Sequence, residues 1–136
     1  MGGEDRWIAA FVLSVCLATT VTTAQESILH HMPPENVLAG ESVTLIASLF
    51  SDMRVMEAKL FIRETNSLNF IEEELNFSGS TWKFTIPNNR ITQAGLEYAI
   101  IFRLDDGSTL AFPRGDPLKN PYNLVIGTPR QSDRSF

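Results

Sequence analysis

From residue 27 onward, apolar and polar residues alternate over short stretches, and turn-forming residues separate one stretch from the next. A period of two places successive side chains on opposite faces of an extended chain, so each stretch is typical of a half-buried β-strand. No helical stripe is longer than about two turns. The alternation predicts strands over residues 27–32, 42–50, 55–64, 81–86, 95–104, 109–112 and 122–126, and two short strands or a bend within 68–77.

Turn residues fix where these strands end. Pro33-Pro34 stops the first strand because proline cannot donate to a strand ladder, and Gly95 opens the clearest strand. Asp105-Asp106-Gly107-Ser108 predicts a hairpin turn, since Asp and Gly accept a positive φ. Seven to eight short strands with turns every eight to twelve residues are typical of a sandwich. We therefore expect an all-β antiparallel sandwich over residues 25–127, with an enclosed barrel as the alternative fold.

Aromatic residues on the predicted inward faces indicate the core. Trp82 and Phe84 share one face of their strand, and Tyr98 and Phe102 share one face of another. Large aromatic side chains bury about 150–250 Å² each, so these four are expected to supply much of the packing. Residues 128–136 are polar apart from the last and show no period, which predicts a tail or linker.

The first 24 residues resemble a targeting segment. Residues 7–21 are apolar and uncharged, and Thr22-Thr23-Ala24 precedes Gln25. Small residues at these positions are typical of signal peptidase sites, so a helical signal peptide cleaved after Ala24 is predicted. The leader lacks the usual positive excess, and the alternative is a membrane anchor, although the run is shorter than the roughly 20 residues that span a bilayer. We expect an exported protein that is secreted, periplasmic or at the cell surface, and that meets membrane only through this leader.

Composition narrows the function classes. The chain has 136 residues, of which 43% are hydrophobic, and its net charge is −5, which argues against a nucleic-acid binder. Cys16 is the only cysteine, so neither an internal disulfide nor a multi-cysteine zinc site can form.

Several short motifs together resemble a known family. They are Ala39-Gly40-Glu41-Ser42-Val43, Ala58-Lys59-Leu60-Phe61-Ile62-Arg63, Trp82-Lys83-Phe84-Thr85-Ile86-Pro87 and Gly95-Leu96-Glu97-Tyr98. The chain resembles the immunoglobulin-like and fibronectin type III-like domains of bacterial secreted and surface proteins. The resemblance implies a stalk, spacer, adhesion or assembly role, often beside neighbouring domains of a longer chain. It also implies a tyrosine corner, in which the Tyr98 hydroxyl bonds to backbone near Gln93 or Ala94.

Candidate interaction and metal motifs each have a simpler structural interpretation. Arg114-Gly115-Asp116 could present an integrin-binding loop, but a Gly-Asp-Pro turn between two strand segments is the favoured explanation. Asp105 and Asp106 could bind calcium, although calcium needs six to eight oxygen ligands. The Glu72-Glu73-Glu74 run is expected to protect a strand edge.

The remaining polar motifs are also weak as evidence of chemistry. His30 and His31 are neighbours that point to opposite faces of a strand, so both are interpreted as exposed polar residues and not as a metal pair. Asn76-Phe77-Ser78 is a glycosylation sequon that matters only in a eukaryotic secretory pathway. No nucleophile constellation, phosphate loop or zinc motif appears, so neither catalysis nor a cofactor is expected.

The sequence therefore predicts a non-catalytic exported sandwich module with a structural, spacer or protein-interaction role. Strand-edge pairing with a protein partner is one mechanism, and the expected edges are residues 27–32 and 122–126. One alternative is an accessory domain ahead of an extracellular enzyme. Another is a carbohydrate-binding module, which would stack sugars on exposed aromatic residues. The candidates for that stacking are Phe61, Phe70, Phe77 and Tyr122.

Overall fold

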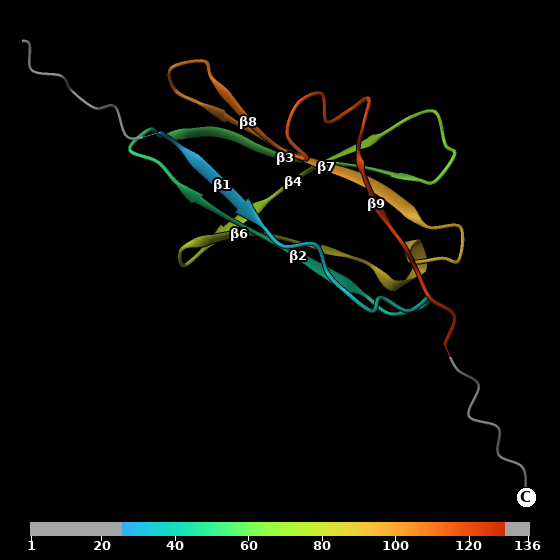
Figure 1. The fold of residues 1–136 in the computed structure, drawn as a ribbon. Coiled ribbons are helices and arrows are strands. Elements are labelled where there is room, and N and C mark those ends of the chain that lie inside the picture. The colour runs from blue at the N-terminus through green and yellow to red at the C-terminus, as the bar shows by residue number, and fades with distance from the viewer. Residues whose placement is uncertain (1–25, 130–136) are drawn as a thin grey trace, which may run out of the picture.

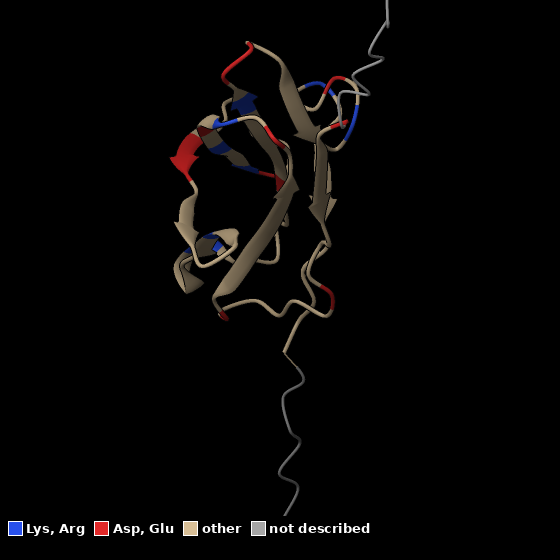
Figure 2. Cartoon of the chain, turned by 90° about the vertical axis from the view of Figure 1, so that its left-hand side faces the viewer, with Lys and Arg blue, Asp and Glu red and all other residues tan. Residues whose placement is uncertain are grey.

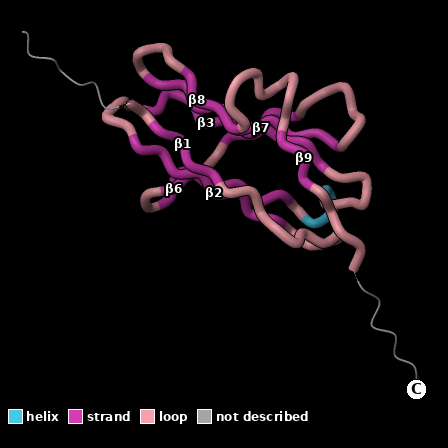
Figure 3. The backbone as a smooth tube through the Cα atoms, in the orientation of Figure 1, coloured by secondary structure: helices cyan, strands magenta, loops and turns pink. Residues whose placement is uncertain are grey.

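The computed structural model describes residues 26–129, so the predicted leader, its cleavage site at Ala24 and Gln25, and most of the predicted tail lie outside the described residues. Extended strands dominate the described chain, and its one helical element is a short 3-10 turn, drawn in cyan in Figure 3. The elements are β1 (Ile28–His31), β2 (Val43–Phe50), β3 (Val55–Glu64), β4 (Ile71–Glu74), β5 (Asn76–Ser78), β6 (Thr81–Ile86), η1 (Asn88–Arg90), β7 (Leu96–Leu104), β8 (Thr109–Phe112) and β9 (Tyr122–Leu124).

The nine strands form two antiparallel sheets that face each other (Figure 1). Sheet 1 has the order β1-β2-β6-β5, and sheet 2 has the order β4-β3-β7-β8, with β9 also paired to β7. The all-β, two-sheet antiparallel prediction is confirmed, and the arrangement is compatible with an immunoglobulin-like fold. One strand more is present than the seven to eight expected, because residues 68–77 divide into two strands that belong to different sheets.

The crossing between the sheets occurs at Leu75. Its side chain is buried, and its backbone N–H donates to the Ala58 carbonyl of β3 at 2.9 Å. Leu75 thereby closes this side of the core, while the strands on either side of it remain free edges.

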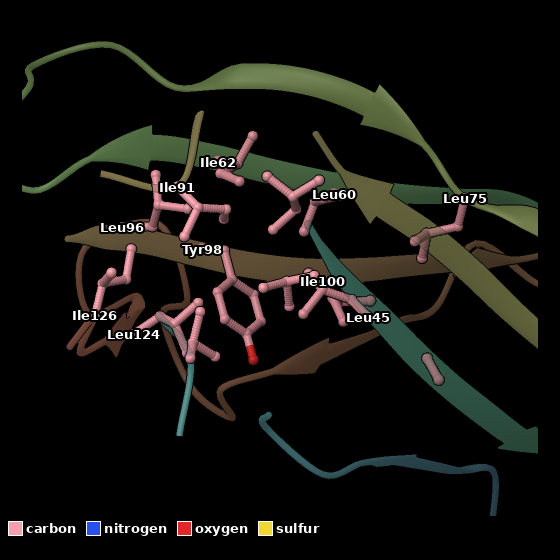
Figure 4. Packing of buried hydrophobic residues seen from close by; sticks show 14 of the residues in the cluster. Leu45, Leu60, Ile62, Leu75, Ile91, Leu96, Tyr98, Ile100, Leu124 and Ile126 are labelled. Atoms are coloured by element: carbon pink, nitrogen blue, oxygen red, sulfur yellow. The ribbon is translucent and has the colours of Figure 1, made fainter. Parts of the chain in front are cut away.

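The core lies between the sheets and follows the period of two. Tyr98, Ile100 and Phe102 of β7 are fully buried, as are Leu60 and Ile62 of β3, which pair with β7 along its whole length. Figure 4 shows Tyr98 and Ile100 of β7 and Leu60 and Ile62 of β3 beside Leu45 of β2 and Ile91 and Ile126 from the connecting segments. The confirmed inward positions explain why alternation alone could locate most strands.

The last strand of sheet 2 is interrupted. β8 pairs with Ile100–Arg103 of β7, and β9 pairs with Leu96–Tyr98, so residues 113–121 form a loop between two strands that share one partner. Beyond β9, Gly127 forms a parallel bridge with Leu38. The Gly127 N–H donates to the Val37 carbonyl at 2.8 Å, and the Ala39 N–H donates to the Gly127 carbonyl at 3.0 Å.

Two predictions about the core are wrong. His31 is buried, with 8% of its surface exposed, and only His30 lies on the solvent side of β1. The Tyr98 hydroxyl bonds to His31 Nε2 at 2.8 Å and not to backbone near Gln93 or Ala94, so the predicted tyrosine corner is absent from the described chain. His31 lies on the inward face of β1, and its ring gives the buried Tyr98 hydroxyl a hydrogen-bond partner.

Candidate functional site: an apolar groove at one end of the sandwich

The outer face of sheet 2 is covered by ion pairs. They are Lys59–Glu72 at 3.3 Å, Arg63–Glu97 at 2.7 Å and Arg103–Glu57 at 3.1 Å. The Arg63 guanidinium also lies 4.2 Å from the centre of the Phe70 ring. In Figure 2 the acidic residues of β4 form a continuous red stretch beside the blue residues of this sheet. These charges are paired with one another, so this face gives little reason to expect a protein partner.

The outer face of sheet 1 has a different character. Its outward strand positions carry one charged residue, Lys83, among the four strands described. Large apolar side chains lie on β1 and β2 instead, where Ile28 is the direct cross-strand partner of Phe50. We call this surface the apolar band, and it consists of Ile28 (50% exposed), Met32 (73%), Ile46 (46%) and Phe50 (65%). In the register of β1 and β2, the pair His30–Ser48 separates Ile28 and Phe50 from Ile46. Large exposed apolar side chains gathered on one face typically mark an interaction site.

A groove of about 510 Å³ opens where the band reaches the end of the sandwich, around the turn from β2 to β3. We call it the end groove, and its apolar lining comes from Leu49, Met53, Val55, Met56, Ala58, Leu75, Phe77 and Trp82. Ser51, Glu57, Lys59 and Glu74 complete its boundary. Ser51 Oγ also lies 2.6 Å from Ser27 Oγ, which ties the start of β1 to the turn beside the groove.

One wall of the end groove is an aromatic pair from sheet 1. Phe77 and Trp82 are cross-strand partners on β5 and β6, and their ring centres are 4.5 Å apart at an angle of 45°. Trp82 also meets the buried Phe102 ring edge-to-face at 5.2 Å. Trp82 is therefore half-buried and belongs partly to the core, as predicted, and partly to the groove. Phe77 is 59% exposed because β5 has three residues and no further strand of the described chain lies beyond it.

Another part of the lining comes from the β2–β3 turn and the start of β3, and it carries two methionines. A β-bulge between Val55 and Glu57 leaves Met56 without a partner on β7. Bulges redirect side chains, and Met56 is 55% exposed at the groove. Met53 lies in the preceding turn, where its backbone N–H donates to Ser51 Oγ at 3.0 Å. Methionine is flexible and polarizable, which suits surfaces that adapt to a bound partner.

The buried His31 is held by hydrogen bonds on both ring nitrogens. The Ile46 carbonyl can only accept, so Nδ1 donates to it at 2.7 Å, and Nε2 accepts from the Tyr98 hydroxyl at 2.8 Å. Burial lowers the pKa of His31 from its ordinary value, and the bond to Ile46 opposes that shift without cancelling it. Burial likewise raises the pKa of Tyr98. Both groups stay neutral at physiological pH, and their packing against other core residues suits a structural role.

The Arg-Gly-Asp tripeptide lies in the loop between β8 and β9. Arg114, Gly115 and Asp116 are all exposed. Asp116 Oδ2 lies 3.7 Å from Lys119 Nζ, and the Asp116 carbonyl accepts a bond from the Asn120 N–H at 2.9 Å. These contacts are those of a local turn on the surface.

The predicted hairpin turn forms as expected around Gly107. Asp106 Oδ1 accepts a bond from the Ser108 N–H at 2.9 Å and one from its hydroxyl, and these bonds lower the pKa of Asp106. Within residues 26–129, no three His, Cys, Asp or Glu side chains gather into a group that could hold a metal ion. Gly95 directly precedes β7 and has a φ of +85°.

The four aromatic residues proposed for sugar stacking lie in separate places. Phe77 belongs to sheet 1, whereas Phe61 and the Arg63-covered Phe70 belong to the side of sheet 2. Tyr122 packs on Tyr98 with ring centres 5.4 Å apart. Only Phe77 is exposed, and the other three are half-buried. A carbohydrate site would therefore depend on Phe77 and Trp82, a tilted pair, rather than on a flat row.

Comparison with known proteins found no match. No protein-family model matches the sequence, and no curated protein shows significant similarity to it. Among residues 26–129, no helix has the length and hydropathy needed to cross a membrane.

Sequence reasoning did not find the end groove or its methionines. Phe77 and Trp82 were singled out, but for different roles, and neither was expected to face the other at an opening. The sequence places Met53 within and Met56 just after a predicted turn, but alternation assigns Met56 to the inward face of its strand, so it gives no signal of the groove.

Proposed function

We propose that this chain is an exported, non-catalytic protein-interaction module, and that a protein partner covers the apolar band and the end groove. The observation that carries the proposal is the contrast between the two outer faces. Ion pairs satisfy the charges of sheet 2, whereas sheet 1 and the adjoining groove expose apolar side chains. Exposed apolar area of this kind costs free energy in water, and a partner that covers it recovers that cost.

The strand order supports an immunoglobulin-like identity for the module. In that fold, four strands in the order A-B-E-D face a sheet built around C, F and G. Here β1-β2-β6-β5 take the first set of positions, and β3, β7 and the interrupted pair β8 and β9 take the second. Within residues 26–129, β1 has a strand partner on one side only, so pairing of a partner strand along its other side is one way to extend the contact.

The experiment compares three substitutions that place a carboxylate at an exposed apolar position. Met56→Asp alters the groove, Phe50→Asp alters the band, and Leu68→Asp alters a residue that is 91% exposed in the turn before β4. Each full-length variant is used to capture proteins from the extracellular and envelope fractions of the source. We expect partners held by the unsubstituted chain and by Leu68→Asp to be depleted about tenfold or more by the other two variants. If all three variants capture the same proteins in equal amounts, the proposal is wrong.

Export is tested separately. The native protein is fractionated by compartment, and its intact mass and first residue are determined. A product that starts at Gln25 outside the cytoplasm supports the proposed leader, whereas an uncleaved membrane-bound product makes residues 7–21 an anchor.

A further inference from the structure

We infer that the end groove binds an apolar side chain from an extended segment of a partner protein, and that a lysine or arginine beside this side chain meets Glu74. The inference rests on the proposed interaction function and names the chemistry of the segment that is recognised. It is carried by the shape and lining of the groove together with the charges at its boundary.

The walls of the groove define the apolar part of the ligand. The lining includes the rings of Phe77 and Trp82 and the thioethers of Met53 and Met56, so a side chain in the groove would contact rings and thioethers. Leu49 and other aliphatic side chains also line the groove. These side chains favour a leucine, methionine or phenylalanine, because contact with them removes apolar area of the ligand from water.

The charges at the boundary favour a basic neighbour. Lys59 is neutralised by Glu72 at 3.3 Å, and Glu57 is paired with Arg103 at 3.1 Å. Glu74 also lines the groove and has no ion-pair partner within residues 26–129. Glu74 is also the cross-strand partner of Lys59, so one lysine lies beside two carboxylates, Glu72 and Glu74. The boundary therefore keeps an excess of one negative charge, in a chain whose net charge is −5. A cation on the ligand complements this charge, whereas an anion is repelled by it.

The backbone beside the groove favours an extended ligand. β4 pairs only with β3, and β5 pairs only with β6, so each has one edge without a strand partner in the described chain. The chain passes from β4 to β5 through Glu74 and Leu75, which both line the groove. An extended segment lying along this edge can use the free backbone groups while one of its side chains enters the groove.

The test uses three synthetic heptapeptides that share a Gly-Ser background and have blocked ends. One has leucine between two lysines, the second has leucine between two glutamates, and the third has serine between two lysines. Binding is followed through the fluorescence of Trp82 in the full chain carrying Trp7→Phe, which leaves Trp82 as the single tryptophan. We expect the lysine-leucine peptide to bind at least about tenfold more tightly than either of the others.

Two variants separate the apolar contribution from the charge. Glu74→Gln is expected to weaken binding of the lysine-leucine peptide about three- to fivefold and to make that binding less dependent on salt concentration. The same variant is expected to bind the glutamate-leucine peptide at least as tightly as the unsubstituted chain does. Met56→Asp is expected to abolish binding of both leucine peptides. Leu68→Asp is the matched control, and thermal unfolding of each variant verifies that these exposed substitutions leave the fold intact.

The possible results are distinguishable. The inference is overturned if no peptide binds, if the glutamate-leucine peptide binds as tightly as the lysine-leucine peptide, or if the serine peptide matches it. It is also overturned if cellohexaose or chitohexaose changes the Trp82 signal in place of the peptides, since the groove would then take a sugar. If the two leucine peptides bind equally tightly but Met56→Asp still depletes the captured natural partner, the further inference is wrong and the proposed function stands.

Discussion

His31 shows how one polar side chain can join three strands at the heart of this sandwich. It belongs to β1, donates to the carbonyl of Ile46 on β2 and accepts from Tyr98 on β7, so it connects the edge of sheet 1 to the centre of sheet 2. Its ring also meets Phe112 of β8 edge-to-face at 4.8 Å. A buried polar group with all its bonds satisfied adds directional contacts that apolar packing lacks.

The pH dependence of stability follows from the lowered pKa of His31. Its ordinary value is 6.5, and the folded-state value lies below that. Between the two values the unfolded chain binds a proton that the folded chain does not, so the free energy of unfolding decreases as the pH falls below about 6.5. The decrease can reach about 1.4 kcal/mol per pH unit in that window. Urea unfolding between pH 5 and 8 measures it.

The control for this prediction compares the two neighbouring histidines. His31→Gln removes the buried titrating group and is expected to flatten the dependence, whereas His30→Gln alters an exposed residue and is expected to keep it. Slopes are compared rather than absolute stabilities, because His31→Gln also loses packing. Equal slopes in all three proteins would show that His31 does not cause the effect.

The sequence could place Tyr98 in the core but could not identify the partner of its hydroxyl. Alternation along β7 gives the inward positions directly, whereas the hydroxyl bonds to a residue 67 positions away. His31 was misplaced for a related reason. Apolar residues occur at both parities in residues 28–32, so their alternation does not tell which face of β1 is buried.

At the scale of elements, two glycines with the same backbone conformation serve different purposes. Gly95 and Gly107 both have a φ of +85°. A Cβ at Gly107 would meet nothing within 4 Å, whereas one at Gly95 would lie 2.8 Å from Thr65 Oγ1. Gly107 is therefore needed only for the backbone conformation of the hairpin turn. Gly95 is needed for its backbone conformation and also because a side chain there would clash with Thr65.

Alanine substitutions at these glycines should differ in cost. Gly107→Ala is expected to lower the free energy of unfolding by about 1–2 kcal/mol from backbone strain alone. Gly95→Ala is expected to lower it by about 2–4 kcal/mol because the added contact must also be relieved. Thr65→Ala in the Gly95→Ala background should recover part of the difference, since it removes a hydroxyl that has no hydrogen-bond partner in the structure. Urea unfolding of the double-mutant cycle tests this, and equal costs at the two glycines would contradict it.

Strand positions were predictable because they depend on local alternation and on turn residues. The predicted ranges 55–64 and 81–86 agree with β3 and β6 at both ends. Two short strands were one of the two alternatives for residues 68–77, and the structure has two, β4 and β5. Their placement in different sheets was not predictable, because it depends on Leu75 reaching a core built by distant strands. The bulge at Met56 likewise depends on pairing with β7 and leaves no mark in the alternation.

At the scale of the molecule, stability should be unevenly distributed. β3 and β7 pair along their full length at the centre of sheet 2, whereas β4 and β5 are short edges whose residues are mostly exposed. Amides near the Leu60–Ile100 pair are therefore expected to exchange with solvent more slowly than those of β5 by about a thousandfold or more. Hydrogen exchange followed by NMR measures both sets. Comparable protection in β5 and β7 would be inconsistent with this distribution.

The end groove is a property of the whole sandwich, which explains why sequence reasoning missed it. Its lining comes from β2, β3, β5, β6 and the connections between them. Each contributing residue has an ordinary local role, such as a core tryptophan or a methionine in a turn. Only the packing of the two sheets brings them around one opening.

The parallel bridge beyond β9 has a mechanical consequence. Residues 26 and 129 lie at opposite ends of the sandwich (Figures 1 and 2), so tension applied through the chain would pull residues 37–39 and Gly127 in opposite directions. Because these segments run parallel, such a pull slides one along the other, and the two hydrogen bonds between them carry the load together. At the other end, β1 would resist the same pull through its pairing with β2 and the two hydrogen bonds of His31. The parallel bridge is therefore one of two contacts that would resist tension along the module.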